Sequence, residues 1–333
     1  MKPVIFGLSG PTLTDDERAF FREAAPLGYI LFKRNCVDPE QMRALTDELR
    51  SLHGRDDLPI TIDQEGGRVS RMQPPVWPAF PTGAAFDALY ERAPISAIEA
   101  ARANGQALAA ILRAAGVNVN LAPMLDVAVE GGTPAIGDRA FGRDPMRVAA
   151  LGRALLDGLR RGGVAGVIKH MPGHGRATVD SHLELPRVSA SAEELATDLL
   201  PFQRLASAPI GMTAHIVFEA WDAELPATLS PTVIREIIRG RIGFDGLLLT
   251  DDIDMKALSG TAGEKAERAL AAGCDVVLDC WARMPEMVEI AGRIGDAPAV
   301  CLERLGRAMG SIGAAEDVPL AELLAKRDAL LGV

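Results

Sequence analysis

The sequence has few cysteines and no long hydrophobic run. Its 333 residues include four cysteines, Cys36, Cys274, Cys280 and Cys301, with no C-x-x-C spacing among them. This pattern favours reduced thiols over a disulfide framework. No stretch approaches the roughly 18 apolar residues of a membrane helix, and the apolar run near the first residue is too short for a signal peptide. We therefore expect a cytoplasmic protein without a membrane partner.

An excess of positive charge is also missing. The chain carries 35 Lys and Arg against 45 Asp and Glu, a formal net charge of −10, which argues against nucleic acid and anionic membranes as partners. Hydrophobic residues make up 48% of the chain, which is ample for a core. The sequence has no internal repeat, low-complexity tract or linker, so we expect a single domain over residues 1–333.

Eight short apolar runs predict buried parallel strands, because such strands are continuously apolar rather than alternating. The runs are Val4–Leu8, Tyr29–Phe32, Pro59–Ile62, Val117–Ala122, Ala165–Lys169, Ile210–Ala214, Leu247–Thr250 and Val276–Leu278.

Helix start signals lie between these runs. They are capping boxes at Thr14/Glu17, Ser96/Glu99 and Ser191/Glu194, and N-caps before proline at Asp38-Pro39 and Ser230-Pro231.

Eight strand–helix units predict an α/β fold consisting of a single (β/α)8 TIM-like barrel. A doubly wound open sheet is the alternative, but Gly7-Leu-Ser-Gly10 does not fit its Gly-x-Gly-x-x-Gly turn. Residues 84–116 are more than one helix needs, so we expect an additional helix there.

Polar residues stand at the ends of the predicted strands. They are Asp63 after the third strand, Asp126 after the fourth, Lys169 and His170 at the fifth, His215 at the sixth and Asp251 at the seventh. In a barrel these ends share one face, and active sites lie there. We therefore expect an active site at this face.

Three of the five histidines fall in one stretch, residues 167–186. Within it, Asp180 and His182 are two residues apart, so the carboxylate can orient the imidazole and favour its charged form. Such a pair is suited to general acid/base catalysis. The alternative is a solvated loop pair.

The spacing of His170 and His174 suggests a metal site only weakly. No His-Glu-x-x-His pattern is present, and Pro172 and Gly173 prevent a helix that would align both rings. We predict no metal and no cofactor, and a tight loop that lets a ligand approach the backbone.

Asp251 and Asp252 follow a deeply apolar strand. Neighbouring strand residues point to opposite faces, so only one of these carboxylates should face the barrel mouth.

The segment from Asp63 to Arg71 combines a carboxylate and two arginines around a Gly-Gly turn. This composition suits a polyhydroxylated or acidic ligand. The alternative is an ion-pair network that closes the top of the barrel, most strongly for Glu65 and Arg68. Among the arginines beyond the fourth strand, Arg139 is the better candidate for binding the ligand.

The motifs resemble those of family 3 glycoside hydrolases. The match rests on Lys-His-Met-Pro-Gly-His-Gly followed by Asp-Ser-His, with Asp-Gln-Glu-Gly-Gly-Arg-Val upstream and Thr-Asp-Asp-Ile-Asp-Met downstream. It runs from about Val4 to about Leu278 and is strongest for the bacterial cytoplasmic β-N-acetylglucosaminidase branch. The resemblance implies a single barrel, no metal, a retaining two-step mechanism and a role in recycling muropeptides. Met171 stands where an aromatic residue is commoner.

The resemblance also implies roles for individual residues. Asp251 is the expected nucleophile, and His182 is the expected acid/base, supported by Asp180. The expected sugar-binding residues are Asp63, Arg71, Arg139, Lys169 and His170. The chemistry agrees, because glycoside hydrolysis needs a carboxylate on one side of the anomeric carbon and a proton donor on the other.

The expected activity is therefore removal of terminal N-acetylglucosamine by an exo-acting, monomeric β-N-acetylhexosaminidase that acts on a carbohydrate or muropeptide substrate. A β-glucosidase or a glycoside phosphorylase is the alternative within the class. From other classes, a barrel metallohydrolase using His170, His174, His182 and Asp251, or a degenerate sugar-binding barrel, stays open.

Overall fold

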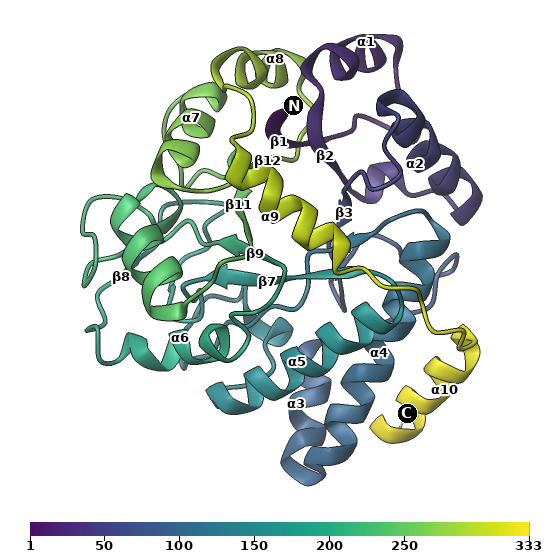
Figure 1. Ribbon diagram of the computed structural model, residues 1–333. Helices are drawn as coiled ribbons and strands as arrows, with labels where there is room; N and C mark the ends of the chain where they lie inside the picture. The colour runs from purple at the N-terminus through teal and green to yellow at the C-terminus, as the bar shows by residue number, and fades with distance from the viewer. Residues whose placement is uncertain (333) are drawn as a thin grey trace.

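The structure, a computed structural model that describes residues 1–332, is built on a closed barrel of eight parallel strands. The order around the barrel is β1-β12-β11-β9-β7-β6-β3-β2 (Figure 1). Every predicted apolar run overlaps one of these strands, so the predicted TIM-like barrel is confirmed. The strands are β1 (Lys2–Gly7), β2 (Pro26–Leu31), β3 (Ile60–Ile62), β6 (Val119–Asn120), β7 (Ala165–Met171), β9 (Ile210–Thr213), β11 (Leu247–Asp252) and β12 (Val276–Asp279).

Helices surround the strands (Figure 1). They are α1 (Asp15–Ala24), α2 (Pro39–His53), α3 (Gly83–Arg92), α4 (Pro94–Ala114), α5 (Pro145–Arg161), α6 (Leu195–Arg204), α7 (Ala262–Ala272), α8 (Met284–Arg293), α9 (Ala299–Gly310) and α10 (Leu320–Leu331). A π-helical segment, η4 (Val233–Ile242), connects β9 to β11. The expected additional helix is present, since α3 and α4 both lie between β3 and β6.

The loops contain several short secondary-structure elements. They are the antiparallel pair β4 (Gln64–Gly66) and β5 (Val69–Ser70), the parallel pair β8 (Arg187–Val188) and β10 (Val217–Phe218), and the 3-10 turns η1 (Lys33–Asn35), η2 (Gly137–Arg139) and η3 (Ala227–Leu229). The β4–β5 hairpin follows β3 directly and carries Glu65 into the barrel mouth.

Most predicted helix caps are confirmed. Thr14 and Glu17 form a reciprocal capping box at the start of α1. The side chain of Asp38 accepts a hydrogen bond from the backbone amide of Gln41 at 2.8 Å, in front of Pro39 in α2. Satisfying these free amides stabilises a helix by about 1 kcal/mol for each cap. The cap from Ser230 to the amide of Val233 is also confirmed. The reciprocal bonds between Ser191 and Glu194 form as predicted, but in the turn before α6, which begins at Leu195.

The predicted box at Ser96 and Glu99 is wrong. Helix α4 begins at Pro94, so Ser96 already lies inside the first turn. Proline is favoured at the first helical position because its fixed φ suits the helix and its missing amide donor is not needed there. Glu99 instead pairs with Arg102 and Lys326.

Apolar side chains fill the barrel interior, and α9 closes the end where the strands begin. Val167, Met212 and Leu249 belong to the same buried cluster as Cys301 and Leu305 of α9. In Figure 1 this helix crosses the barrel. The carboxyl ends of the strands are left as the open end, where barrel enzymes carry their active sites.

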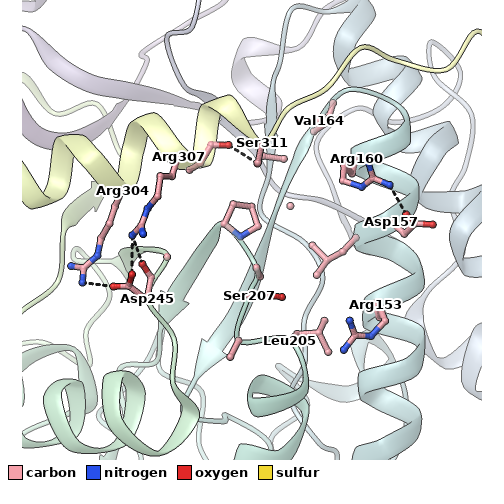
Figure 2. Close-up of a pocket in the computed structure, with 18 of the residues that line it drawn as sticks. Arg153, Asp157, Arg160, Val164, Leu205, Ser207, Asp245, Arg304, Arg307 and Ser311 are labelled. Carbon is pink, nitrogen blue, oxygen red and sulfur yellow. Dashed lines mark hydrogen bonds and ion pairs between the residues drawn. The ribbon is translucent and has the colours of Figure 1, made fainter.

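A cavity of about 750 Å³ lies beside α9 (Figure 2). Its walls include Ala165, Pro209 and Gly246, at or just before the starts of β7, β9 and β11. Four arginines also line it, Arg153, Arg160, Arg304 and Arg307. None of the predicted site residues lines it. It belongs to the closed end of the barrel and is separate from the predicted site.

No helix within residues 1–332 is both long and apolar enough to cross a bilayer.

Candidate active site

The predicted sugar-binding and nucleophilic residues converge on the carboxyl ends of the strands. Asp63 directly follows β3, Lys169 and His170 stand near the end of β7, and Asp251 lies in the last part of β11. Parallel strands of a barrel end at one rim, so segments far apart in sequence meet there.

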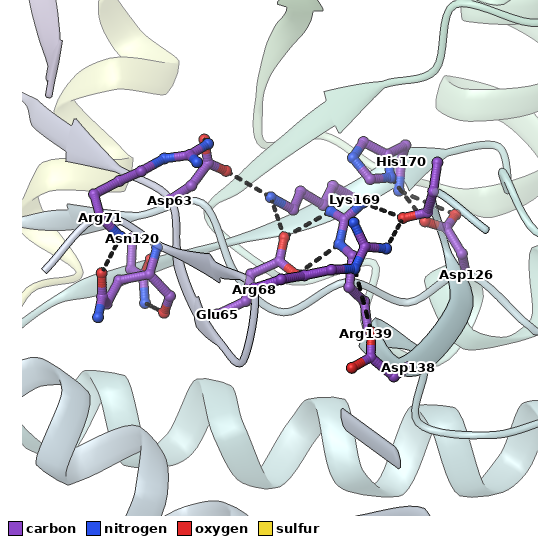
Figure 3. A network of polar contacts seen from close by, with 12 residues as sticks. Asp63, Glu65, Arg68, Arg71, Asn120, Asp126, Asp138, Arg139, Lys169 and His170 are labelled. Atoms are coloured by element: carbon purple, nitrogen blue, oxygen red, sulfur yellow. Dashed lines mark hydrogen bonds and ion pairs between the residues drawn. The ribbon is translucent and has the colours of Figure 1, made fainter. Parts of the chain in front are cut away.

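Lys169 is the centre of a buried charge network (Figure 3). Its ammonium nitrogen lies 2.8 Å from Oδ1 of Asp63 and 2.7 Å from Oε1 of Glu65, and its side chain is 2% exposed. Arg71 contacts Oδ2 of Asp63 at 3.1 Å. Arg139 makes two hydrogen bonds to Glu65, at 2.7 and 2.9 Å. Each charge is therefore paired, as burial requires.

The network holds its members in their ionised forms. Burial alone would raise the pKa of Asp63, but Lys169 and Arg71 outweigh it and keep that pKa below its usual value. Burial would lower the pKa of Lys169, but Asp63 and Glu65 raise it. A carboxylate offers about four acceptor positions, so Asp63 can still accept hydrogen bonds from sugar hydroxyls.

Arg139 and Glu65 form a brace within this network. Besides Glu65, Arg139 donates to the backbone carbonyl of Ala135 at 3.0 Å. Its ion pair lies at 12% and 11% side-chain exposure, close to Lys169. Glu65 therefore takes part in the ion-pair network that the sequence offered as the alternative to ligand binding. Arg139 contacts the rest of the site through Glu65.

Asp126 fixes the turn that follows β7. This fully buried carboxylate lies 2.7 Å from Nδ1 of His170 and accepts the backbone amides of His170 and His174 at 3.2 and 2.6 Å. Burial opposes its charge, but these partners lower its pKa. Because Asp126 occupies Nδ1, His170 can meet a ligand only through Nε2.

Glycines in this turn allow a close backbone approach. Gly173 has a φ of +134°, which L side chains rarely adopt. A Cβ atom at Gly175 would lie 1.8 Å from the carbonyl oxygen of Val127. The tight loop predicted from Pro172 and Gly173 is present.

The surroundings of Asp251 stabilise the ionised form of its carboxyl group. Burial raises the pKa of its carboxyl, but His170, His215, the amide of Asp252 and Lys169 together hold it below its usual value. The amide of Asp252 donates to Oδ1 of Asp251 at 2.8 Å. A partly buried, ionised carboxylate at the barrel mouth is equipped to attack an electrophilic carbon.

Asp252 has different surroundings from its neighbour. It accepts hydrogen bonds from the indole nitrogen of Trp281 at 3.1 Å and from the amide of Cys280 at 3.4 Å. Burial, with the nearby Asp251 charge, raises its pKa to about 6. The two adjacent carboxylates thus have different partners, in line with the strand alternation.

Asp180 and His182 form the expected pair. Oδ1 of Asp180 lies 2.7 Å from Nδ1 of His182 and accepts the His182 amide at 2.9 Å. The His182 side chain is 67% exposed, and Asp180 is its only hydrogen-bond partner among residues 1–332. Its Nε2 is therefore available to a leaving group.

Ser181, between these two residues, is buried and anchors the loop. Its hydroxyl lies 3.2 Å from Nε2 of His174, and its carbonyl accepts the amide of Ala257 at 3.2 Å. Ala257 belongs to the segment that follows β11. The Asp180–His182 pair is therefore tethered beside the strand that carries Asp251.

The sequence pattern did not identify Ser181 or Trp281 as residues of this site. A serine at position 181 does not by itself indicate a hydrogen bond to His174, because that bond depends on the path of the loop. Trp281 could have been found, because it follows the eighth strand as the other site residues follow theirs.

No three His, Cys, Asp or Glu side chains gather into a metal-binding group anywhere in residues 1–332.

Comparisons with known proteins find close relatives. The model of the glycosyl hydrolase family 3 N-terminal domain matches residues 13–298. A β-hexosaminidase of Methylococcus capsulatus is 44% identical over 282 residues, 83% of this chain and 82% of its own. A β-hexosaminidase of Alkalilimnicola ehrlichii is 42% identical over 283 residues, 84% of this chain and 80% of its own.

A solved structure is similar over nearly its full length. It is NagZ from Neisseria gonorrhoeae in complex with N-trifluoroacetyl-D-glucosamine, with a TM-score of 0.87 and 32% identity, covering 99% of this chain and 97% of that one.

Proposed function

The chain belongs to glycosyl hydrolase family 3 and is a β-hexosaminidase, and we propose that it is a retaining, exo-acting β-N-acetylglucosaminidase. We propose that it removes terminal β-linked N-acetylglucosamine from muropeptides, GlcNAc-anhydroMurNAc-peptides, in cytoplasmic peptidoglycan recycling. The observation that carries the proposal is the ionised, partly buried Asp251 beside the Lys169 network, with a His–Asp pair tethered to the segment after the same strand.

The Lys169 network binds the sugar in this proposal. Asp63 accepts hydrogen bonds from hydroxyl groups, and Lys169 and Arg71 donate to them. Nε2 of His170 donates to a hydroxyl group or accepts from one, depending on the tautomer. Arg139 acts through Glu65, which it holds in place. Because these charges are paired before the sugar arrives, little reorganisation is needed on binding. The similar solved structure holds an N-acylated glucosamine, which supports this class of ligand.

Asp251 attacks the anomeric carbon in the first step. The bond between that carbon and the leaving oxygen breaks as the bond to the Asp251 carboxylate forms, which gives a covalent glycosyl-enzyme. The low pKa of Asp251 keeps its carboxylate ionised for this attack.

His182 supplies the proton in the first step and removes one in the second. Its protonated Nε2 donates to the leaving oxygen, and the neutral ring then takes a proton from the water that attacks the intermediate. The carboxylate of Asp180, whose pKa is lowered by its bonds to His182 despite partial burial, stabilises the charged ring. No metal or cofactor is needed for either step, and residues 1–333 act as one catalytic domain.

The decisive experiment compares matched substrates. We expect an aryl N-acetyl-β-glucosaminide to be cleaved with a kcat/KM at least about tenfold higher than that of the aryl β-glucoside, because a missing hydrogen-bonding group strands buried polar partners. Equal rates would favour a β-glucosidase. Release of a sugar 1-phosphate in phosphate buffer would favour a phosphorylase. A disaccharide-peptide from peptidoglycan then tests the natural leaving group.

A further inference from the structure

Trp281 is a large aromatic side chain left open at the barrel mouth. It comes two residues after the end of β12, and 55% of it is exposed. No other aromatic residue is found among the large exposed hydrophobic residues of the described chain. Tryptophan is highly buried on average in folded proteins, so an exposed ring at a catalytic rim needs a reason.

The Trp281 ring is held in place rather than loose. Its indole nitrogen donates to Oδ2 of Asp252 at 3.1 Å. The other oxygen of Asp252 accepts the amides of Cys280 and Asp254, at 3.4 and 3.1 Å. This bond ties the ring to the end of β11, the strand that carries Asp251.

The chain beyond Trp281 also fixes the ring. Ala282 has a φ of 56°, which is uncommon for a residue other than glycine and costs about 1 kcal/mol. The guanidinium carbon of Arg283 lies 6.0 Å from the centre of the Trp281 ring. Arg283 is itself held by Asp254 at 2.5 Å and Glu286 at 2.7 Å. These two carboxylates neutralise the charge of Arg283, so its guanidinium is not available to bind an anion.

We propose that Trp281 is the stacking platform of the leaving-group subsite, where its ring binds the pyranose ring of the leaving sugar. The inference rests on the proposed function, which puts the terminal sugar among Asp63, Lys169 and His170 and the cleaved bond at Asp251. The leaving sugar then extends toward the rim beside Asp252. The indole nitrogen is already bonded to Asp252, so Trp281 offers its ring face. Aromatic faces pack against the apolar C–H face of a pyranose.

The test compares a leaving group that fills the subsite with one that does not. The disaccharide N,N′-diacetylchitobiose releases a sugar, whereas N-acetyl-β-glucosaminyl fluoride releases only fluoride. For Trp281→Ala we expect kcat/KM on the disaccharide to fall about tenfold, mainly through KM, because a stacked ring is lost. On the fluoride it should change less than about twofold. The matched variant Trp281→Phe keeps a ring and loses the bond to Asp252, so it should retain most activity on the disaccharide.

Other outcomes overturn the subsite. An equal loss on both substrates in a variant with an unchanged melting temperature would mean that Trp281 acts through Asp252 on Asp251. Unchanged kinetics on the disaccharide would mean that the ring does not meet the leaving sugar. If Trp281→Phe loses as much on the disaccharide as Trp281→Ala, stacking is also rejected. The proposed function is tested separately on the unaltered protein, which must cleave both substrates whatever the variants do.

Discussion

Among single residues, the adjacent carboxylates at the end of β11 give the sharpest contrast. Asp251→Ala should lower turnover of an aryl N-acetyl-β-glucosaminide by about 10³-fold or more, because it removes the proposed nucleophile. Asp252→Asn should keep most of that turnover, because its amide oxygen still accepts from Trp281. Steady-state kinetics on both purified variants measures this difference. Comparable losses would reject the assignment of Asp251 over its neighbour.

The role of His182 predicts a dependence on the leaving group. In His182→Ala, cleavage of a sugar leaving group should fall by about 10² to 10⁴-fold, the usual contribution of a general acid. A dinitrophenolate leaving group needs no proton, so the first step should survive and the glycosyl-enzyme should accumulate. Rapid mixing should therefore show a burst, with an adduct on the peptide that carries Asp251. Asp180→Ala should act in the same direction but less severely.

Substrate-assisted attack by the acetamido group is the contrary mechanism. It predicts no adduct by mass spectrometry despite continued turnover, together with equal losses for good and poor leaving groups. That result would remove both Asp251 and His182 from their proposed roles.

At the level of elements, the loop between β7 and β8 is held through Ser181, a buried residue between the partly buried Asp180 and the exposed His182. Ser181→Ala removes the bond to His174, so the loop should open more often. We expect kcat to fall about threefold to tenfold, which corresponds to the roughly 1 kcal/mol of one lost hydrogen bond. Proteolysis between residues 172 and 186 should also become faster.

A matched control is available at Ser191, just beyond β8. Ser191→Ala also removes a serine hydroxyl, but from the exposed cap bonded to Glu194. It should lower stability slightly without changing kcat. If both variants proteolyse and turn over alike, the tether through Ser181 has no specific effect.

The same elements explain what sequence could and could not predict. Barrel strands are readable because burial on both faces makes them continuously apolar, and Asp63, Lys169 and Asp251 are readable because they interrupt that pattern at the rim. The start of α4 was misplaced because Pro94 begins the helix before Ser96. The bond from Ser181 to His174 was out of reach, since it depends on a loop path with no periodic pattern.

For the molecule as a whole, buried histidines predict a loss of stability in mild acid. Burial, with His170 nearby, lowers the pKa of His174 to about 4. Between its unfolded pKa of about 6.5 and this value, the unfolded chain binds the proton more readily, so stability falls as pH falls. The contribution is roughly 3 kcal/mol over that window.

Denaturant unfolding at several pH values measures this effect. His174→Gln, which cannot titrate, should flatten the slope between about pH 6.5 and pH 4. Asp252 and Asp279 act in the opposite direction, because burial raises their pKa values to about 6 and about 7. They are unchanged in the variant, so the comparison isolates His174. An unaltered slope would contradict the neutral, buried state of His174.

The intact enzyme should also tolerate removal of metal ions. Its histidines are assigned to hydrogen bonding and proton transfer, so we expect full activity after dialysis against a chelator. A loss that a divalent ion restores would revive the metallohydrolase alternative.

The barrel is closed by strands from opposite ends of the sequence. Val4 of β1 lies opposite Val277 of β12, so nearly the whole chain separates two residues that pair. During synthesis β1 must wait with an unpaired edge until β12 has left the ribosome. Such an edge can pair with another chain, and long-range pairing slows folding. A nascent chain that stalls after β11 would therefore have the complete Lys169 network in its sequence but an open sheet that favours aggregation.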